Sequence, residues 1–158
     1  MSERRRRPNP ASDDLDVDLE PDLTTAAFPP LWHVFVVLAG GFLGTLARYA
    51  VVFHHPAPPH GIDTSVILIN VSGAFVLGIL ATTLFQRRPD ATSVRLFLTT
   101  GILGGWTTYS AIIAGSITLG HHHALGAAVL NLAIELVAPV AGALLGGLLG
   151  SAFLKEAV

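Results

Sequence analysis

The chain has 158 residues, of which 51% are hydrophobic and only 13% are charged, whereas an ordinary soluble domain carries roughly 25% charged residues. It contains no cysteine, which excludes a disulfide framework, a thiolate metal site and a thiol nucleophile. The formal net charge of −2 hides a strong segregation of charge, and the composition predicts an integral membrane protein.

The first 30 residues differ in composition from the rest. They contain arginines at positions 4–7, six acidic residues between positions 13 and 22, and five prolines. Such a segment cannot bury enough apolar surface to offset the entropy of ordering, so residues 1–30 are predicted to be a disordered cytoplasmic tail. A cleavable signal peptide is not expected, because no apolar region closely follows the arginines.

Four apolar runs follow, at about 31–53, 64–85, 94–119 and 124–153. Each covers the roughly 20 residues that a membrane-spanning helix needs, and short connections make successive helices antiparallel neighbours. Residues 31–158 are therefore predicted to form one all-α membrane domain of four spans. Because no soluble part remains and no nucleophile–base pair or metal motif lies in the spans, neither an enzyme nor a nucleic-acid partner is expected.

The first and second spans carry few polar residues. Gly40 and Gly44 are four residues apart in the first span, a spacing that lets helix backbones approach closely. Arg48 lies near the outer end of the same span. The second span contains Asn70, whose amide hydrogens suit an anion better than a cation.

The third span is interrupted at its centre by the sequence Gly101-Ile-Leu-Gly-Gly-Trp-Thr-Thr-Tyr-Ser110. Its glycines, followed by Thr107, Thr108, Tyr109 and Ser110, weaken a helix. Backbone freed from helical pairing at membrane depth must be satisfied by protein, by a cavity or by an ion. Because broken helices are where membrane proteins place their ions, this segment predicts an ion or solute path.

The fourth span carries a stripe of Gly142, Gly146 and Gly150 that predicts close helix packing, within or between subunits. Asn131 and Glu135 are four residues apart and share one helical face. At about 1.5 Å per residue, Glu135 lies roughly 16 Å below the outer end of this span, near the membrane midplane. An ionised carboxylate there would repel an anion, so it must be neutral, paired or away from a conducting pore; the roles of both residues stay open.

Charge placement predicts the orientation. Eight of the nine lysines and arginines fall in the tail, around the second connection or at the C-terminus. Because cytoplasmic segments carry the excess of positive residues, both termini are predicted to be cytoplasmic in a multi-pass cell-membrane protein. Six of the seven histidines fall on the outer side, where they either bind a transition metal, report pH or simply make the loops polar.

Three passages resemble one known family. They are Gly40-Gly-Phe-Leu-Gly-Thr-Leu-Ala-Arg-Tyr49, Asn70-Val-Ser-Gly-Ala-Phe75 and Gly104-Gly-Trp-Thr-Thr-Tyr-Ser110, in spans one, two and three. In that order, and with four spans, they are similar to the Fluc (CrcB) fluoride channels over about residues 31–150. The resemblance implies an antiparallel dimer of four-span subunits with two narrow fluoride pores at the interface and a structural sodium ion at the dimer centre.

The resemblance also implies roles for single residues. The backbone carbonyls of Gly104 and Thr107 match those that hold the sodium ion, and Arg48 matches the arginine of the first-span motif, in a vestibule. The residues that match or neighbour the family's fluoride pore lining are Asn70, Thr108, Tyr109, Ser110 and Ile112. Amides, hydroxyls and aromatic ring edges can replace the water around fluoride. A membrane that is negative inside then drives export passively, by about 2.3 kcal/mol per charge per 100 mV.

Some residues depart from the family pattern. Ile112 stands where a second phenylalanine is expected, and it has no ring edge to offer an anion. Ala127 and Ala128 stand where the family's tyrosine is expected, and Glu135 is unusual. The strong charge bias also disfavours a homodimer, which would need one sequence to insert in both orientations.

We therefore expect a heterodimer with a homologous subunit inserted the opposite way and only one intact pore. A homodimer, a non-conducting assembly subunit, and a small proton-coupled multidrug-type exporter with Glu135 as proton carrier remain alternatives. The sequence does not show which pore conducts or what the tail does.

Overall fold

The computed structural model describes residues 30–58, 61–88, 90–122 and 124–156, so nearly all of the predicted tail lies outside the described residues. The described part is all-helical, as predicted, and has four helical stretches that are long and apolar enough to cross a membrane. They are Leu31–His54, Thr64–Arg87, Thr92–His121 and Leu125–Leu154.

Two of these stretches are single helices and two are composite. The elements in chain order are α1 (Leu31–His54), α2 (Thr64–Thr82), α3 (Leu84–Arg87), α4 (Thr92–Arg95), the π-helix η2 (Leu96–Leu103), α5 (Gly104–Trp106), α6 (Ser110–His121) and α7 (Leu125–Glu156). The start of α2 is fixed by Asp63, whose carboxylate accepts hydrogen bonds from the backbone N–H groups of Ser65 and Val66, at 2.9 and 3.3 Å.

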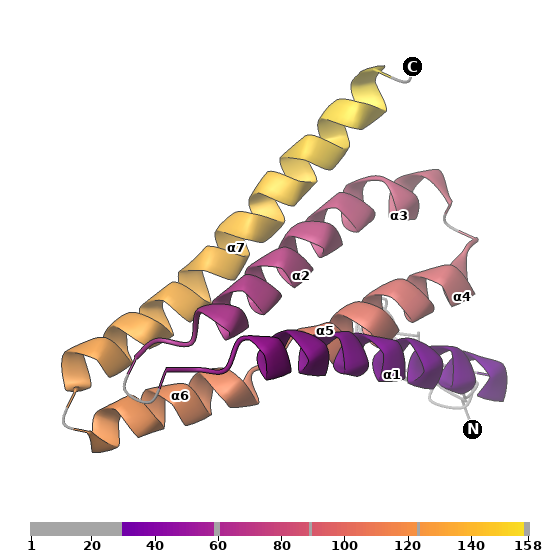
Figure 1. Ribbon diagram of the computed structural model, residues 1–158. Coiled ribbons are helices and arrows are strands. Elements are labelled where there is room, and N and C mark those ends of the chain that lie inside the picture. The colour runs from indigo at the N-terminus through magenta and orange to yellow at the C-terminus, as the bar shows by residue number, and fades with distance from the viewer. Residues whose placement is uncertain (1–29, 59–60, 89, 123, 157–158) are drawn as a thin grey trace, which may run out of the picture.

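The helices pack in two groups that diverge from one another (Figure 1). One is the pair α2 and α7, and the other is α1 with η2 and α5, while α6 packs against the first part of α7. Both ends of the helical domain and the α3–α4 connection lie on the right in Figure 1, and the other two connections lie on the left. The third stretch, from α4 to α6, therefore links the two groups.

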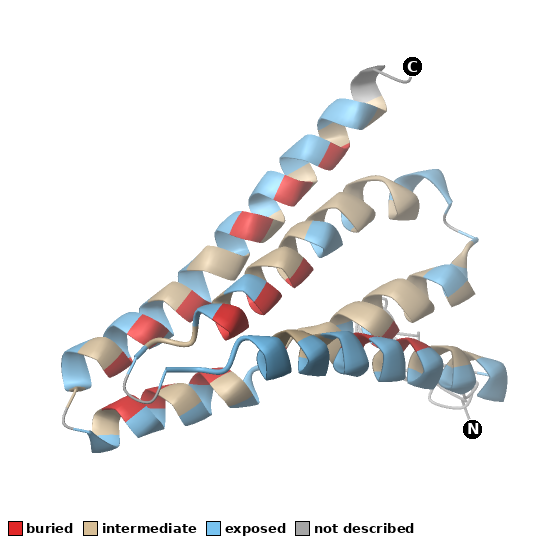
Figure 2. Cartoon of the chain, viewed as in Figure 1, coloured by how far each residue is buried: buried red, intermediate tan, exposed pale blue. Residues whose placement is uncertain are grey.

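Close backbone contacts through glycine hold each group together. On α7, Gly142, Gly146 and Gly150 face the backbone of α2, and a Cβ at Gly142 would lie 3.0 Å from the carbonyl oxygen of Val71. On α1, a Cβ at Gly40 would lie 2.5 Å from the carbonyl oxygen of Phe97 in η2. The stripes predicted from the sequence thus pack helices within the subunit, and Figure 2 shows buried residues on the side of α7 that faces α2.

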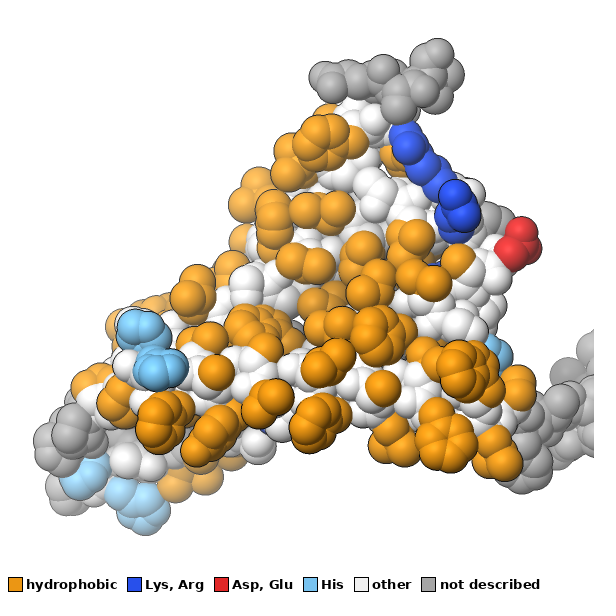
Figure 3. All heavy atoms as spheres, turned by 45° about the vertical axis from the view of Figure 1, so that its right-hand side comes forward, with side chains coloured by type: hydrophobic (Ala, Val, Ile, Leu, Met, Phe, Trp, Pro, Cys, Tyr) orange, Lys and Arg blue, Asp and Glu red, His pale blue; other side chains and the backbone are white. Residues whose placement is uncertain are grey.

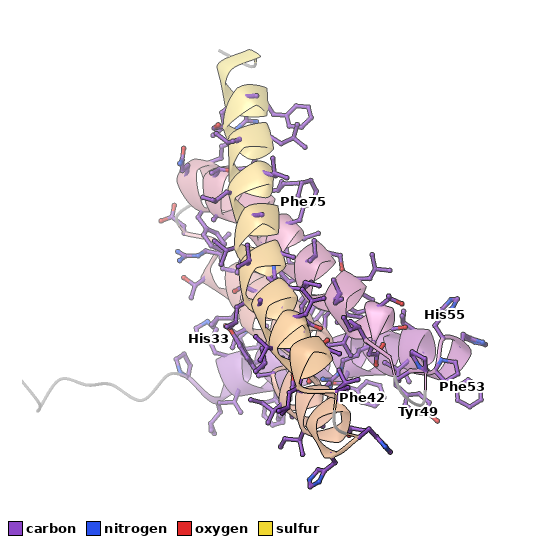
Figure 4. The ribbon with its side chains drawn as sticks, turned by 90° about the vertical axis from the view of Figure 1, so that its left-hand side faces the viewer. His33, Phe42, Tyr49, Phe53, His55 and Phe75 are labelled. Atoms are coloured by element: carbon purple, nitrogen blue, oxygen red, sulfur yellow. The ribbon has the colours of Figure 1, made fainter. Side chains whose placement is uncertain are left out.

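The outer surface is apolar along most of its length. Large side chains such as Phe42, Phe53 and Leu148 are more than half exposed, and the face in Figure 3 is mostly hydrophobic. Figure 4 shows Phe42, Tyr49 and Phe53 along α1, with the ring centroids of Tyr49 and Phe53 5.9 Å apart. Apolar exposure on this scale suits lipid rather than water.

Candidate functional site

The site is built around the junction of α5 and α6. Helix α5 ends at Trp106 and α6 begins at Ser110. Between them, Thr107 has extended backbone, with φ −74° and ψ 156°. Its N–H still donates to the Leu103 carbonyl at 3.0 Å, so ordinary helical pairing reaches Thr107 and changes at the next residue.

The backbone of Thr108 is bound by a side chain from another helix. In a continuous α-helix the Thr108 N–H would donate to the Gly104 carbonyl, but here it donates to Oδ1 of Asn70 at 2.9 Å. The Thr108 carbonyl accepts a hydrogen bond from Nδ2 of the same asparagine at 3.1 Å. Asn70 thereby satisfies both backbone groups of a buried non-helical residue, as an apolar environment requires.

Asn70 makes a third hydrogen bond, to a residue of α7. Its Nδ2 also donates to Oε2 of Glu135 at 3.1 Å. An asparagine amide has two hydrogens, and this one directs one to Thr108 and one to Glu135. Only 6% of Asn70 and 3% of Glu135 are exposed. The carboxylate that the sequence placed near the membrane midplane is therefore paired with the asparagine predicted to line the pore.

Two backbone carbonyls at the junction lose their usual donors. Gly104 loses Thr108, because the Thr108 N–H points to Asn70. Thr107 would pair with the Ala111 N–H in a continuous helix, but that N–H lies 3.5 Å from Oγ1 of Thr108 instead. These are the two carbonyls that the sequence predicted as sodium ligands, and free carbonyl oxygens suit a hard cation. The residues present therefore fit a sodium ion.

A cavity of about 300 Å³ lies between α2, the junction and α7. The predicted site residues that line it are Asn70, Gly104, Thr107, Thr108, Tyr109, Ile112 and Glu135. The rest of its wall is largely aliphatic and includes Leu136 and Pro139 of α7. The fold thus brings together, from three separate spans, most of the residues singled out in the sequence.

The other predicted residues lie beside the cavity or away from it. Ser110 is not part of the cavity wall, but its hydroxyl lies 3.2 Å from the hydroxyl of Thr108, which is. Arg48 is a half-buried residue of α1 and is not part of the cavity wall. Asn131 donates to the hydroxyl of Ser116 at 3.0 Å and so joins α7 to α6. Of the wall residues, Tyr109 is 77% exposed and Ile112 is buried.

The outer histidines do not form a metal site in the part of the chain that the structure describes. Within residues 30–58, 61–88, 90–122 and 124–156, no group of three or more histidine, cysteine, aspartate or glutamate residues is placed to hold a metal ion. His60 and His123 lie outside the described residues.

Three features of the site were not predicted from the sequence. The indole N–H of Trp106 donates to the hydroxyl of Ser72 at 3.0 Å and ties α5 to α2; a buried indole needs such an acceptor, which is the signal that could have revealed it. The π-helix η2 precedes the junction, and π-helical turns are frequent at functional sites. Pro139 lies one turn after Glu135 in α7 and has no N–H to pair with the Glu135 carbonyl.

Comparison with known protein families identifies the family of the chain. The family model described as "CrcB-like protein, Camphor Resistance (CrcB)" matches residues 35–147, well over half of the chain. The chain belongs to the CrcB family. The CrcB match runs from the first turns of α1 into the last part of α7 and contains the whole cluster of Asn70, Thr108 and Glu135.

Curated CrcB relatives cover most of the domain. One, named "Fluoride-specific ion channel FluC 2", from Thermobifida fusca, is 39% identical over 67% of this chain and 79% of its own length. A second, named "Fluoride-specific ion channel FluC", from Ruminiclostridium cellulolyticum, is 32% identical over 74% of this chain and 91% of its own. Another protein named "Fluoride-specific ion channel FluC", from Agrobacterium fabrum, is 30% identical over 75% of this chain and 95% of its own length.

Proposed function

We propose that this chain is a subunit of a fluoride-selective channel that lowers cytoplasmic fluoride by passive, voltage-driven export. Two relatives named as fluoride-specific ion channels are matched over 91% and 95% of their length. The observation in this chain that carries the proposal is the Asn70 side chain, which joins α2 to the non-helical junction at the wall of the cavity. Donors held at a helix break are the means by which a dry site replaces the hydration shell of an ion.

A structural sodium ion would be held by the carbonyls of Gly104 and Thr107. Both lie at the cavity wall and have lost their helical donors. When bound, the ion would supply positive charge that favours a nearby anion path. The protein's own part is to hold the two carbonyls at the junction, to which Asn70 contributes by binding Thr108, the residue after Thr107.

The pore lining in this proposal comes from one face of the junction. Besides Asn70, the hydroxyls of Thr108 and Ser110 lie 3.2 Å apart and offer polar contacts, and Tyr109 offers a ring edge. Ile112 contributes an aliphatic wall, and Arg48 would attract fluoride into a vestibule outside it. The exposed side chain of Tyr109 is available to a second subunit.

We propose that the functional unit is a dimer with a homologous subunit inserted the opposite way, with both termini of this chain in the cytoplasm. The positive residues of the described chain lie at one end of the helical domain, apart from Arg48. Such a bias selects one orientation in the cell membrane. An opposite orientation must then come from another chain.

The test is fluoride efflux from liposomes under a potassium gradient with valinomycin, read with a fluoride electrode. The chain is reconstituted alone and with a candidate homologue of opposite charge bias, and chloride efflux and empty liposomes serve as controls. Fluoride-selective flux in either case supports the channel, and flux only with the homologue supports the heterodimer. Silence in both, with folded protein, contradicts the proposal.

Two other functions compete with this one. A non-conducting assembly subunit is favoured because Thr108 and Glu135 accept hydrogen bonds from the Asn70 side-chain amide. It predicts that pore substitutions in this chain leave the flux of the dimer unchanged. A proton-coupled exporter is favoured by the buried carboxylate of Glu135 at a cavity. It predicts proton-dependent export of an organic cation that Glu135→Gln abolishes.

A further inference from the structure

Glu135 is the only described acidic side chain that lies within the helix packing rather than at a helix end or loop. Its Oε2 lies 3.1 Å from Nδ2 of Asn70, its partner is a neutral amide, and it is almost completely buried. Burying a charged group is costly unless it is hydrogen-bonded. A buried carboxyl group in the cavity wall therefore needs a physical explanation.

The carboxylate stands where an anion bound by Asn70 would stand. One hydrogen of the amide is committed to the Thr108 carbonyl, which holds the junction together. The other is the one hydrogen that could reach a ligand, and it points to Glu135. An anion arriving through the cavity must therefore displace the carboxylate from the amide and must also withstand its charge at short range.

The backbone around Glu135 holds it in this place. Asn131, one turn earlier on the same face of α7, is bonded to Ser116 of α6, which fixes the rotation of α7. On the other side, Gly142 packs against the carbonyl of Val71, the residue after Asn70. Glu135 thus faces Asn70 because α7 is fixed against α2 and α6 both before and after it.

We propose that Glu135 is a tethered anion that competes with fluoride for the Asn70 amide and so limits conduction along the path that this subunit lines. The inference rests on the proposed fluoride channel function and adds a residue that sets its throughput. It also gives a physical cause for unequal pores in a dimer. A partner with an uncharged residue at this place leaves its own asparagine amide free, whereas this chain occupies its amide from within.

The first experiment compares Glu135→Gln and Glu135→Ala with the unaltered protein in the liposome efflux assay. Glutamine keeps an acceptor for Asn70 and removes the charge, while alanine removes both. We expect initial fluoride efflux to rise by roughly tenfold in Glu135→Ala, the value of about one charge-assisted hydrogen bond, and by less in Glu135→Gln. The control Ser151→Ala removes a polar side chain from α7 away from the cavity wall and should not raise efflux. Efflux in both Glu135 variants at or below that of the unaltered protein overturns the inference.

A second experiment reads the amide itself and does not depend on flux. The protein is labelled with ¹⁵N-asparagine in micelles, and the Asn70 side-chain resonances are identified by their loss in Asn70→Ser. Sodium fluoride should shift them in Glu135→Ala at a concentration roughly tenfold lower than in the unaltered protein, and sodium chloride should not. Equal sensitivity in the two proteins, or no response in either, overturns the inference.

The two experiments separate the inference from the function on which it rests. A difference in amide titration without flux in any variant removes the channel and keeps Glu135 as an occupant of an anion site. Flux that is fluoride-selective and unaffected at position 135 keeps the channel and removes the role of Glu135. If Glu135→Ala fails to fold, Glu135→Gln is used in both the efflux assay and the amide titration, because glutamine keeps the side-chain size and the hydrogen-bond acceptor.

Discussion

At the scale of a single residue, the side chain of Asn70 makes three hydrogen bonds that connect three helical stretches. It replaces the two hydrogen bonds that Thr108 would make in a helix, and it satisfies the carboxylate of Glu135. A buried backbone group left without a partner costs about 1–3 kcal/mol. The non-helical residues between α5 and α6 are thus bound by an asparagine of α2, 38 residues away in sequence.

Replacement of Asn70 by aspartate tests this directly. The aspartate has no amide hydrogen, so the Thr108 carbonyl loses its donor and a second carboxyl group faces Glu135. We expect fluoride efflux to fall by at least roughly tenfold and the free energy of unfolding to fall by about 1–3 kcal/mol.

The measurements are liposome efflux and unfolding in mixed micelles. Asn131→Asp makes the same chemical change at the asparagine bonded to Ser116 and should lose stability without a comparable loss of flux per folded dimer. Undiminished flux in Asn70→Asp would remove Asn70 from the fluoride path.

A second residue-scale prediction concerns Trp106 and Ser72. The Trp106 indole N–H is 3.0 Å from the Ser72 hydroxyl, and neither partner is charged. Trp106→Phe and Ser72→Ala should each destabilise the protein, and the double variant should lose about 0.5–1.5 kcal/mol less than the sum of the two. A double-mutant cycle on unfolding in mixed micelles measures this coupling, and strictly additive losses would show that the bond contributes nothing to stability.

At the scale of elements, the third stretch is assembled from pieces that depend on their neighbours. The π-helix η2 lies along α1 because Gly40 and Gly44 allow its backbone to approach. On the other side, α6 is joined to α7 through Asn131 and Ser116. The junction at residues 107–109 lies where these two attachments meet, so its position is set by packing on both sides as well as by its own sequence.

The adjacent glycines of α1 give an element-scale test with an internal control. A Cβ at Gly40 would lie 2.5 Å from the Phe97 carbonyl oxygen and 2.9 Å from the Gly101 Cα, whereas a Cβ at Gly41 would meet nothing within 4 Å. Gly40→Ala should lower the free energy of unfolding by about 1–3 kcal/mol. Gly41→Ala should be neutral or stabilise by up to about 1 kcal/mol, because alanine is the better helix former.

Thermal unfolding in detergent, with size-exclusion chromatography to follow assembly, compares the two variants. Similar stability in Gly40→Ala and Gly41→Ala would contradict the close packing of α1 on η2. A loss in Gly41→Ala that appears only in assembly would instead place that glycine at a contact between subunits.

At the scale of the whole molecule, positive side chains and histidines lie at different ends of the described helical domain. Arg87, Arg88 and Arg95 lie around the α3–α4 connection, while described histidines such as His55 and His121 lie at the opposite end of the domain. Figure 3 shows the positive side chains of that face together at one end and a group of histidines at the other. Such a separation favours a single orientation during insertion.

Cysteine labelling measures that orientation, because the chain has no cysteine of its own. Thr92 lies beside the α3–α4 connection and Ala57 lies in the α1–α2 connection, and both are exposed. A membrane-impermeant maleimide should label Ala57→Cys in intact cells and Thr92→Cys only after permeabilisation. Neither substitution changes the charge. Equal labelling of both in intact cells would show dual orientation and remove the reason to expect a partner of opposite insertion.

The sequence by itself determined the class of the protein, its helical spans and its family. Apolar runs of this length indicate membrane-spanning helices, because a bilayer requires the backbone to be paired within the segment. The family follows from the order of three motifs along the chain. Both signals lie in the linear sequence, so neither depends on which residues are in contact in the folded protein. Asn70, Thr108 and Glu135 could likewise be named from the sequence as polar groups in apolar surroundings, whereas the roles of Gly104 and Ile112 came only from the family resemblance.

Which of these residues act on one another depends on how the four helical stretches pack. Asn70, Thr108 and Glu135 come from three spans, and their contacts depend on the rotation of each helix, which glycine packing and the Asn131–Ser116 bond determine. The sequence left Glu135 neutral, paired or remote, and the fold places it 3.1 Å from the amide of Asn70. Periodicity gives the face of a helix on which a residue lies, but the neighbour that it meets there is set by packing across the whole domain.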